Sequence, residues 1–234
     1  VYARTAAEAK QIERRVAAGS LEVVMPGLYA RPEYWSELKL RQRYLHRVRA
    51  LARQHPGWTF CSYTAAVICG LSVSNVNLRY IHIAVPPTQT TTPGSEIIRH
   101  RYIRRTSASQ LDIAVTDIDQ TITDCLVDAS FVEGLIIADS VLHEQLMSKK
   151  HLIATVDELG RGRRGVAMAR WVAQQADGLS ESGGESKARA LMIERGWQVP
   201  ELQVELFDPV EPGKPYRVDY LWRVGDRLII GELD

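Results

Sequence analysis

Apolar side chains recur at helical spacing near the start of the chain. Ile12 and Val16 share the inward face of a helix predicted over Ala6 to Ala17, which Gly19 is expected to end. The outward face of this helix carries the basic residues Lys10, Arg14 and Arg15. The pattern therefore predicts an amphipathic helix with a basic polar face.

Two short β-like runs follow this helix. Leu21 to Val24 and Leu28 to Ala30 are joined by Met25-Pro26-Gly27, where proline presets φ and glycine can take the positive φ of a tight turn. A helix followed by a β-hairpin is the element order of a winged helix-turn-helix. We therefore expect a winged-helix-like N-terminal segment.

A second helical pattern runs from Ser36 to His55 and ends before Pro56-Gly57. Its apolar positions are Leu38, Leu45, Val48 and Ala52, and its other positions include Arg41, Arg43, Arg47, Arg49 and Arg53. Such a surface is either the solvated basic face of an ordinary helix or a surface that contacts nucleic-acid phosphates. The sequence leaves both interpretations open.

The rest of the chain alternates helical and strand-like patterns, which predicts an α+β protein. In the middle we expect helices over Tyr63–Cys69, Thr121–Met147, Leu152–Leu159 and Val166–Ala176, and strands over Ile81–Val85 and Ile97–Ile103. After the Gly/Ser-rich stretch 178–184 we expect a helix from Ser182 to about Arg195, then strands over Leu202–Phe207, Arg217–Trp222 and Arg227–Asp234.

Charge is distributed unevenly along the 234 residues. Lys and Arg exceed Asp and Glu by 11 to 5 in residues 1–56, fall short by 11 to 12 in residues 57–179, and fall short by 7 to 11 in residues 180–234. We divide the chain into three expected domains at these boundaries. The basic first segment is suited to a polyanion, and the acidic last segment could hold a cation.

Several classes of protein are disfavoured by the sequence. No segment approaches the roughly 18 apolar residues that span a membrane, and no charged-then-apolar leader precedes Val1. Cys61, Cys69 and Cys125 are odd in number and lack CxxC spacing, so they favour buried apolar packing over a disulfide framework or zinc site. We expect a cytoplasmic protein without a membrane partner.

Two carboxylates of the last predicted hairpin form a candidate metal site. If Val224 and Gly225 form a two-residue loop, Asp219 faces Ile230 and Glu232 becomes its diagonal neighbour on the same face of the sheet. A three-residue loop would place Glu232 on the opposite face. Mg²⁺ or Mn²⁺ commonly takes one or two protein carboxylates and completes its shell with water and phosphate.

Glu185 has two possible roles. Ser182-x-x-Glu185 has the pattern of a capping box, in which the serine accepts from the helix N-terminus and the glutamate reaches back to the cap N–H. Alternatively, the first turn of this helix points a third carboxylate at the metal site.

Three stretches together resemble a known family: residues 17–30, Ser180-Glu181-Ser182-Gly183-Gly184-Glu185-Ser186, and the pair Arg217-Val218-Asp219-Tyr220 with Gly231-Glu232-Leu233-Asp234. They resemble actinobacterial AbiEi-type antitoxin-domain proteins with a C-terminal domain similar to very-short-patch-repair endonucleases of the PD-(D/E)xK class. The resemblance implies a divalent metal on Asp219 and Glu232, assisted by Glu185, with water attacking a DNA phosphodiester.

The sequence departs from this pattern at one catalytic position. The lysine expected two residues after the glutamate is Asp234, and Lys187 or Arg217 could replace it only where geometry allows. A complete PD-(D/E)xK core also has a further helix and strand, so the resemblance implies a truncated core and a longer protein.

Two functions follow as expectations. One is a DNA-binding, Mg-dependent endonuclease with Lys10, Arg14, Arg15, Arg41 and Arg47 on duplex DNA and catalytic Glu185, Asp219 and Glu232. The other is an antitoxin-like transcriptional regulator with an inactive nuclease-like domain and a cognate toxin as partner. A third possibility is a cytoplasmic assembly protein without nucleic-acid contact.

Overall fold

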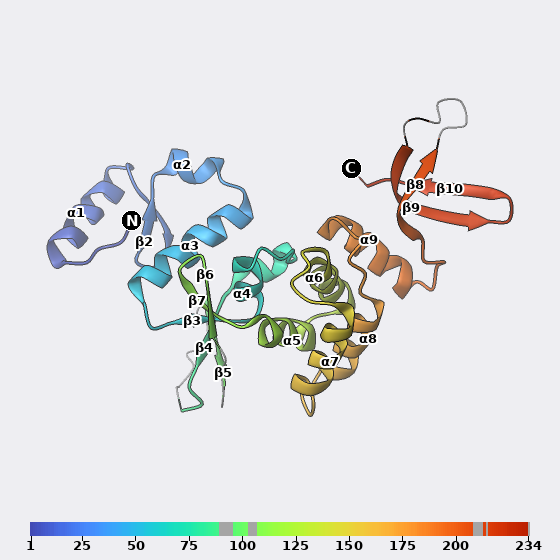
Figure 1. Ribbon diagram of the computed structural model, residues 1–234. Helices are drawn as coiled ribbons and strands as arrows, with labels where there is room; N and C mark the ends of the chain where they lie inside the picture. Colours follow the sequence, from blue (N-terminus) through green and yellow to red (C-terminus); the bar gives the residue numbers. More distant parts are fainter. Residues whose placement is uncertain (89–95, 103–106, 208–212, 214, 234) are drawn as a thin grey trace. The chain divides into compact units, whose positions relative to one another are not determined.

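The computed structural model describes residues 1–88, 96–102, 107–207, 213 and 215–233. It confirms a mixed α+β architecture in two compact units (Figure 1). Unit 1 comprises residues 1–68 and 75–116, and unit 2 comprises residues 69–74 and 117–234. The boundaries expected after residues 56 and 179 therefore fall inside unit 1 and unit 2, respectively.

The first elements of unit 1 follow the sequence pattern closely. Helix α1 spans Ala6–Ala17, as predicted, and buries Ile12. Strands β1 (Glu22–Met25) and β2 (Leu28–Ala30) pair antiparallel. Gly27 has φ +76°, so the expected turn conformation is confirmed. The hairpin differs from the prediction only by a one-residue shift of its first strand.

The expected single helix from Ser36 to His55 is wrong. The structure has two helices, α2 (Pro32–Glu37) and α3 (Leu40–Gln54), separated by Leu38 and Lys39 in extended conformations. Arg43 of α3 stabilises the break, because its guanidinium donates to the carbonyl oxygens of Trp35 and Ser36, both at 2.9 Å. These carbonyls lie at the end of α2, where helical acceptors lack partners.

A mixed five-stranded sheet completes unit 1. Its strand order is β5-β4-β3-β7-β6, from strands β3 (Thr59–Phe60), β4 (Ile81–Val85), β5 (Ile97–Arg101), β6 (Ser107–Gln110) and β7 (Ile113–Thr116). The sequence pattern predicts β4 and the whole of β5 but not the three others, and the expected end of β5 at Ile103 lies outside the described residues. Helix α4 (Ser62–Ile68) is buried along its whole length, and the 3₁₀ helix η1 (Asn75–Arg79) follows it.

Unit 2 begins with helices α5 (Ile118–Asp128), α6 (Phe131–His143), α7 (Lys149–Leu159), α8 (Val166–Gln175) and α9 (Gly183–Glu194). The expected continuous helical stretch Thr121–Met147 is wrong, because the chain breaks between α5 and α6. Ser130 caps α6 through its hydroxyl, which accepts from the N–H of Glu133, and the Glu133 carboxylate accepts from Ser130. A capping box therefore starts a new helix inside the apolar pattern.

A three-stranded antiparallel sheet ends unit 2, in the order β10-β9-β8 (Figure 1). The strands are β8 (Glu201–Phe207), β9 (Pro215–Val224) and β10 (Arg227–Gly231). All three were predicted, with different ends. Position 234, where the family pattern has lysine, lies outside the described residues.

None of the described cysteines is in a disulfide bond, and Cys61 and Cys125 are buried as expected. Cys69 is half-buried, and burial raises the pKa of its thiol. Among the helices that the structure describes, none is both long and apolar enough to cross a bilayer.

Candidate functional site

Asp219 lies on β9, the central strand of the unit 2 sheet. Val224 of β9 opposes Arg227, so the turn is Gly225-Asp226 and not the expected Val224-Gly225. Gly225 accounts for this choice, because it takes the first turn position at φ +58°, a conformation that favours glycine over valine. The expected pairing of Asp219 with Ile230 is therefore wrong.

The observed register also changes the expected alignment of Glu232 with Asp219. Tyr220 opposes Gly231, the last residue of β10, so extending the register by one residue sets Glu232 opposite Asp219. Such directly opposed positions share one face of a sheet. The backbone N–H of Leu233 donates to Asp219 Oδ2 at 2.9 Å, so the segment after β10 stays beside this carboxylate.

Glu185 is held at the start of α9. Ser182 is the N-cap, and its hydroxyl accepts from the backbone N–H of Glu185 at 3.1 Å, as half of the predicted capping box requires. The other half differs, because the Glu185 carboxylate accepts from the N–H of Glu181 at 3.0 Å. Glu185 is buried, and its carboxylate faces the sheet rather than serving the cap alone.

Gln203 joins Glu185 to Asp219. Its amide Nε2 donates to Glu185 Oε2 and to Asp219 Oδ1, both at 3.1 Å. The backbone of Gln203 is unusual for a strand: φ is +52°, and the β8–β9 ladder pairs Leu202 and Val204 but skips the residue between them. A non-glycine residue in the left-handed region is strained, and such strain often marks functional sites.

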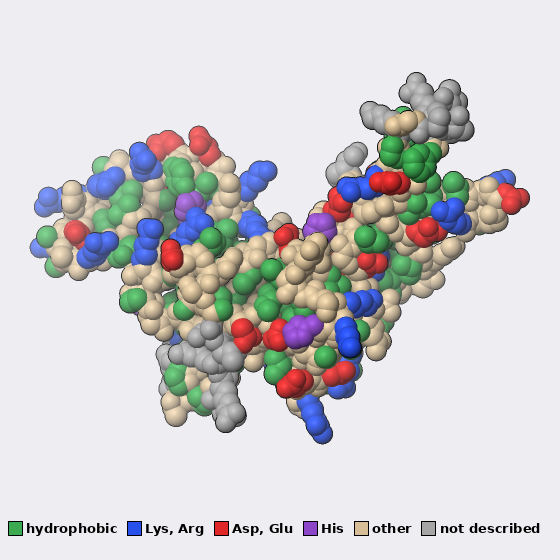
Figure 2. Space-filling view, in the orientation of Figure 1, with side chains coloured by type: hydrophobic (Ala, Val, Ile, Leu, Met, Phe, Trp, Pro, Cys, Tyr) green, Lys and Arg blue, Asp and Glu red, His purple; other side chains and the backbone are tan. Residues whose placement is uncertain are grey.

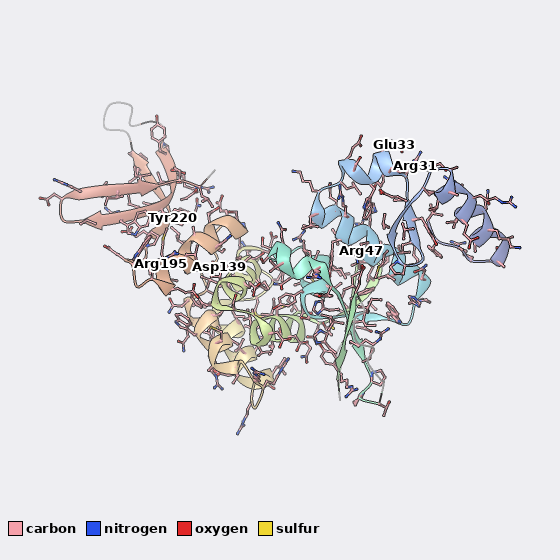
Figure 3. All side chains as sticks on the ribbon, turned by 180° about the vertical axis from the view of Figure 1, so that it is seen from behind. Arg31, Glu33, Arg47, Asp139, Arg195 and Tyr220 are labelled. Atoms are coloured by element: carbon pink, nitrogen blue, oxygen red, sulfur yellow. The ribbon has the colours of Figure 1, made fainter. Side chains whose placement is uncertain are left out.

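We name Glu185, Gln203 and Asp219 the carboxylate cluster. It gathers side chains from α9, β8 and β9, and its negative potential acts on neighbours. Burial raises the pKa of Tyr220, and the Glu185 and Asp219 carboxylates raise it further. The hydroxyl of Tyr220, which Figure 3 labels, donates to the backbone oxygen of Glu185 at 2.9 Å. This hydrogen bond connects β9 to α9.

The donor set suits a hard divalent cation. Two carboxylates from different elements converge on one partially positive amide, and Gln203 also carries an oxygen that a cation accepts as ligand. The described residues contain no group of three or more His, Cys, Asp or Glu side chains placed to hold a metal. The predicted set Glu185, Asp219 and Glu232 is therefore not brought together as one three-carboxylate group.

Cationic side chains lie near the carboxylate cluster. Arg217 precedes Asp219 by two residues on β9, on the same face of the strand, and its guanidinium pairs with Glu181 at 2.7 Å. Lys187 is exposed on α9, two residues beyond Glu185. The sequence indicated both as replacements for the expected lysine, and Arg217 reaches the residue whose N–H binds Glu185.

The predicted DNA-contacting residues divide into two groups. Lys10, Arg14 and Arg15 are exposed on α1, and basic side chains are visible over α1 and α3 in Figure 2. Arg41 and Arg47 of α3 are engaged within unit 1. Arg41 donates to the carbonyl oxygen of Val67 at 3.3 Å, and Arg47 forms an ion pair with Glu96.

Sequence reasoning missed Gln203 and Arg31 as candidates, and it named Arg49 and Arg53 only as part of a basic helix surface. Gln203 lies between two apolar residues of an expected strand, and no local signal marks its backbone. Arg31, Arg49 and Arg53 are exposed in unit 1, and none of them forms an ion pair among the described residues. An exposed arginine without an intramolecular carboxylate is available for an external anion.

Part of the chain is similar in sequence to known proteins. No protein-family model matches it. Two uncharacterized proteins of Mycobacterium tuberculosis, from strains CDC 1551 and H37Rv, are each 38% identical to it over 84 residues. The match covers 36% of this chain and 30% of each relative, less than a third of the relatives' own length.

Proposed function

We propose that this protein binds duplex DNA through a winged-helix-like N-terminal segment and carries a divalent-metal-dependent, endonuclease-like site in unit 2. The carboxylate cluster is the observation that carries the proposal. Glu185 and Asp219 are far apart in sequence, yet one amide donates to both of them. The PD-(D/E)xK pattern described from the sequence adds support through Glu232.

Each residue has a role in this proposal. Asp219 and Glu232 would hold Mg²⁺ or Mn²⁺, and Glu185 and Gln203 would shape the site around it. The metal supplies charge stabilisation at a DNA phosphodiester under attack by water. Arg217 lies on the same strand face as Asp219 and could neutralise phosphate charge after leaving Glu181.

A second candidate function is an antitoxin-like regulator that binds DNA without cutting it. The observation that favours it is Asp234, an anion in the place of the expected lysine. An extra negative charge repels phosphate and cannot position water as a lysine does. A cognate toxin would then be the further partner of the regulator.

Plasmid cleavage separates the two functions. We expect the full-length protein to nick supercoiled DNA with Mn²⁺, and Asp219→Asn to lose this activity. Duplex binding without any cleavage in either protein would favour the regulator. Activity retained in Asp219→Asn would exclude the carboxylate cluster as the catalytic site.

The DNA-binding half of the proposal predicts a salt dependence that is specific to α1. Replacing Lys10, Arg14 or Arg15 by glutamine should flatten the slope of log K against log salt by about one unit each, because one phosphate contact is lost. The measurement is fluorescence anisotropy of a labelled duplex. Arg170→Gln is the matched control, because Arg170 is exposed but pairs with Asp157 in unit 2. Affinity independent of salt would contradict the prediction.

A further inference from the structure

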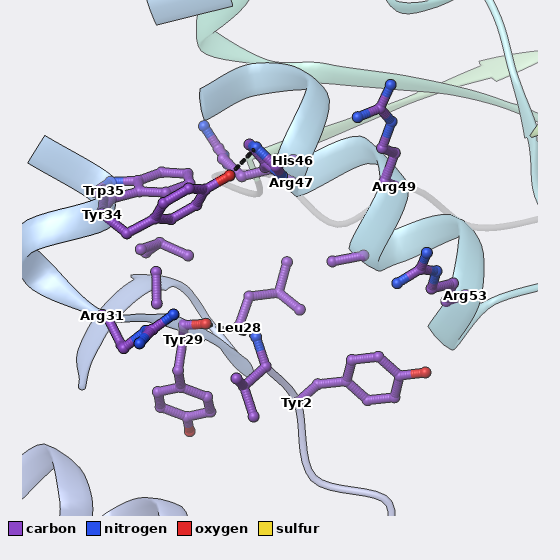
Figure 4. A pocket seen from close by; sticks show the side chains of 14 residues that line it. Tyr2, Leu28, Tyr29, Arg31, Tyr34, Trp35, His46, Arg47, Arg49 and Arg53 are labelled. Carbon is purple, nitrogen blue, oxygen red and sulfur yellow. Dashed lines mark hydrogen bonds between the residues drawn. The ribbon is translucent and has the colours of Figure 1, made fainter. Parts of the chain in front are cut away.

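Unit 1 contains a pocket of about 450 Å³ between the β1–β2 hairpin and helices α2 and α3 (Figure 4). Its size lies within the range of roughly 300–1,000 Å³ that is usual for small-molecule sites. The pocket is separate from the carboxylate cluster, which belongs to unit 2. Neither the metal site nor the basic face of α1 uses it.

The charged residues that line the pocket are all positively charged. Four of its 14 residues are arginines, and none is Asp or Glu. Those arginines are Arg31, Arg47, Arg49 and Arg53. Arg47 pairs with Glu96 through its terminal nitrogen, but its buried Nε has no hydrogen-bond partner among the described residues. The pocket therefore offers unused donors to an anion.

Aromatic side chains form much of the remaining wall: Tyr2, Tyr29, Tyr34 and Trp35. Tyr34 is 45% exposed, yet its hydroxyl is anchored to His46 Nε2 at 2.8 Å. Burial lowers the pKa of His46, and Arg49 lowers it further, so the neutral ring can accept this hydrogen bond. Tyr34 thus presents a fixed aromatic surface to the pocket.

We propose that this pocket binds one unpaired nucleotide of a DNA strand, with its phosphate on Arg53 and its base against Tyr34, Trp35 and Arg31. Figure 4 shows Arg31 at the start of α2 and Arg53 near the end of α3 on different sides of the pocket. Arginines that track the phosphate beside aromatic rings that stack on bases are the usual elements of single-strand recognition. This inference rests on the proposed nucleic-acid binding and names an unpaired base as its further substrate.

The test measures binding of 5′-dAMP to the full-length protein by isothermal titration calorimetry. Charge-assisted hydrogen bonds and base stacking each correspond to about a tenfold change in Kd. We expect Arg31→Gln, Arg53→Gln and Tyr34→Leu each to weaken dAMP binding about tenfold. Arg170→Gln is the matched control and should leave dAMP binding unchanged, because Arg170 is an exposed arginine of unit 2 that pairs with Asp157. Arg31 makes no side-chain cap on α2, so its replacement preserves the helix start.

Two ligand arms test the chemistry of the pocket. Deoxyadenosine and inorganic phosphate should each bind at least about tenfold more weakly than dAMP, because each offers half of the recognised group. Equal Kd values for dAMP in the parent and in both arginine variants would overturn the proposal. Displacement of dAMP by an equal concentration of an octaglutamate peptide would also overturn it, and would assign the pocket to an acidic protein segment.

Binding to two DNA duplexes distinguishes a nucleotide within a DNA strand from a free nucleotide. A duplex with one bulged adenine should bind about tenfold more tightly than the fully paired duplex, and Arg53→Gln should remove the difference. Binding of dAMP without this preference would overturn the assignment to a DNA strand in favour of a free nucleotide. If the protein binds duplex DNA in a salt-dependent way but does not bind dAMP, the pocket inference is wrong and the proposed function stands. If the protein binds dAMP but not duplex DNA, the proposed DNA-binding function is wrong and the nucleotide pocket stands.

Discussion

Helix α9 carries two charged side chains, one turn apart, that meet carboxylates in opposite ways. Arg189 pairs with Asp139 of α6, which Figure 3 labels, and its NH2 group donates to both carboxylate oxygens at 2.7 Å. Glu185 instead lies beside another anion, Asp219, with only the Gln203 amide between them. The first pair is nearly inaccessible, with side-chain exposures of 4% and 0%.

The difference distinguishes a buried structural ion pair from the proposed metal site. Burial raises the pKa of Asp139, and Arg189 together with the N–H of Asp177 opposes that shift. The positive charge that a buried carboxylate requires is thus part of the fold. Among the described residues, neither Glu185 nor Asp219 forms an ion pair, and in the proposed function an external cation supplies the missing positive charge.

The largest predicted effect is the loss of stability when the buried Arg189–Asp139 ion pair is broken. Arg189→Met should lower the free energy of unfolding by about 3–5 kcal/mol, because it leaves the Asp139 carboxylate buried without its cation. Urea denaturation measures this. The matched control Arg217→Met, which breaks an exposed pair with Glu181, should cost no more than about 1 kcal/mol. Equal losses in the two variants would contradict the distinction, and Asp139→Leu with Arg189→Met should recover much of the stability.

His82 in unit 1 is a buried imidazole whose neighbour is another histidine. Its Nδ1 lies 2.8 Å from Nε2 of His100. Burial lowers the pKa of His82 to about 3, and His100 contributes. The unfolded chain therefore binds the proton first, so stability is fully present above pH 6.5 and falls as the pH drops toward 3. We expect a loss of roughly 3 kcal/mol at pH 4 from this group. The difference between parent and His82→Gln in urea denaturation across pH 4–7 measures it, and parallel curves would refute it.

The carboxylate cluster predicts that added Mn²⁺ stabilises the protein against unfolding. The parent should gain about 2.7 kcal/mol of stability at a Mn²⁺ concentration one hundredfold above Kd, and Asp219→Asn should gain almost none. Without metal, Asp219→Asn should be as stable as the parent or slightly more stable, because it removes repulsion between anions. Thermal melts of both full-length proteins with and without Mn²⁺ decide this, and equal responses would exclude the metal site.

The smallest effect separates the two roles of Glu185. Glu185→Ala should cost about 1 kcal/mol, because it removes the acceptor for the Glu181 N–H. Glu185→Gln keeps an acceptor and should cost less, but it should weaken the Mn²⁺ response. Glu194→Gln, at the exposed end of the same helix, is the control. An unchanged Mn²⁺ response in Glu185→Gln would restrict Glu185 to a structural role.

The sequence by itself predicted the elements whose signals are local. Helix α1 and the Pro26-Gly27 turn were found because amphipathic spacing and turn residues act within a few positions. The same reasoning joined α2 to α3 and α5 to α6, because apolar periodicity continues across both breaks. Pro32 and the Ser130–Glu133 capping box were available as local signals for the true helix starts.

The candidate site was predictable in part. The Ser182 cap and the presence of Asp219 and Glu232 on a hairpin follow from residue types and spacing. Their register was predicted wrongly: the turns Val224-Gly225 and Gly225-Asp226 align the strands differently, and valine is disfavoured at the positive φ of the first turn position. Pairing along the whole ladder, with Gly225 at positive φ, selected the second turn.

Only the tertiary structure decided which charged residues are available and which are engaged. The arginines of α3 are equivalent in sequence, yet Arg41 and Arg47 meet partners from distant segments. Arg49 and Arg53 form no ion pair among the described residues and line a pocket to which Arg47 also contributes. Gln203 is the extreme case: its placement depends on a left-handed backbone within β8 and on carboxylates 18 and 16 residues away. Periodicity describes which face of its own element a side chain occupies, whereas its partner is set by the elements that pack against that face.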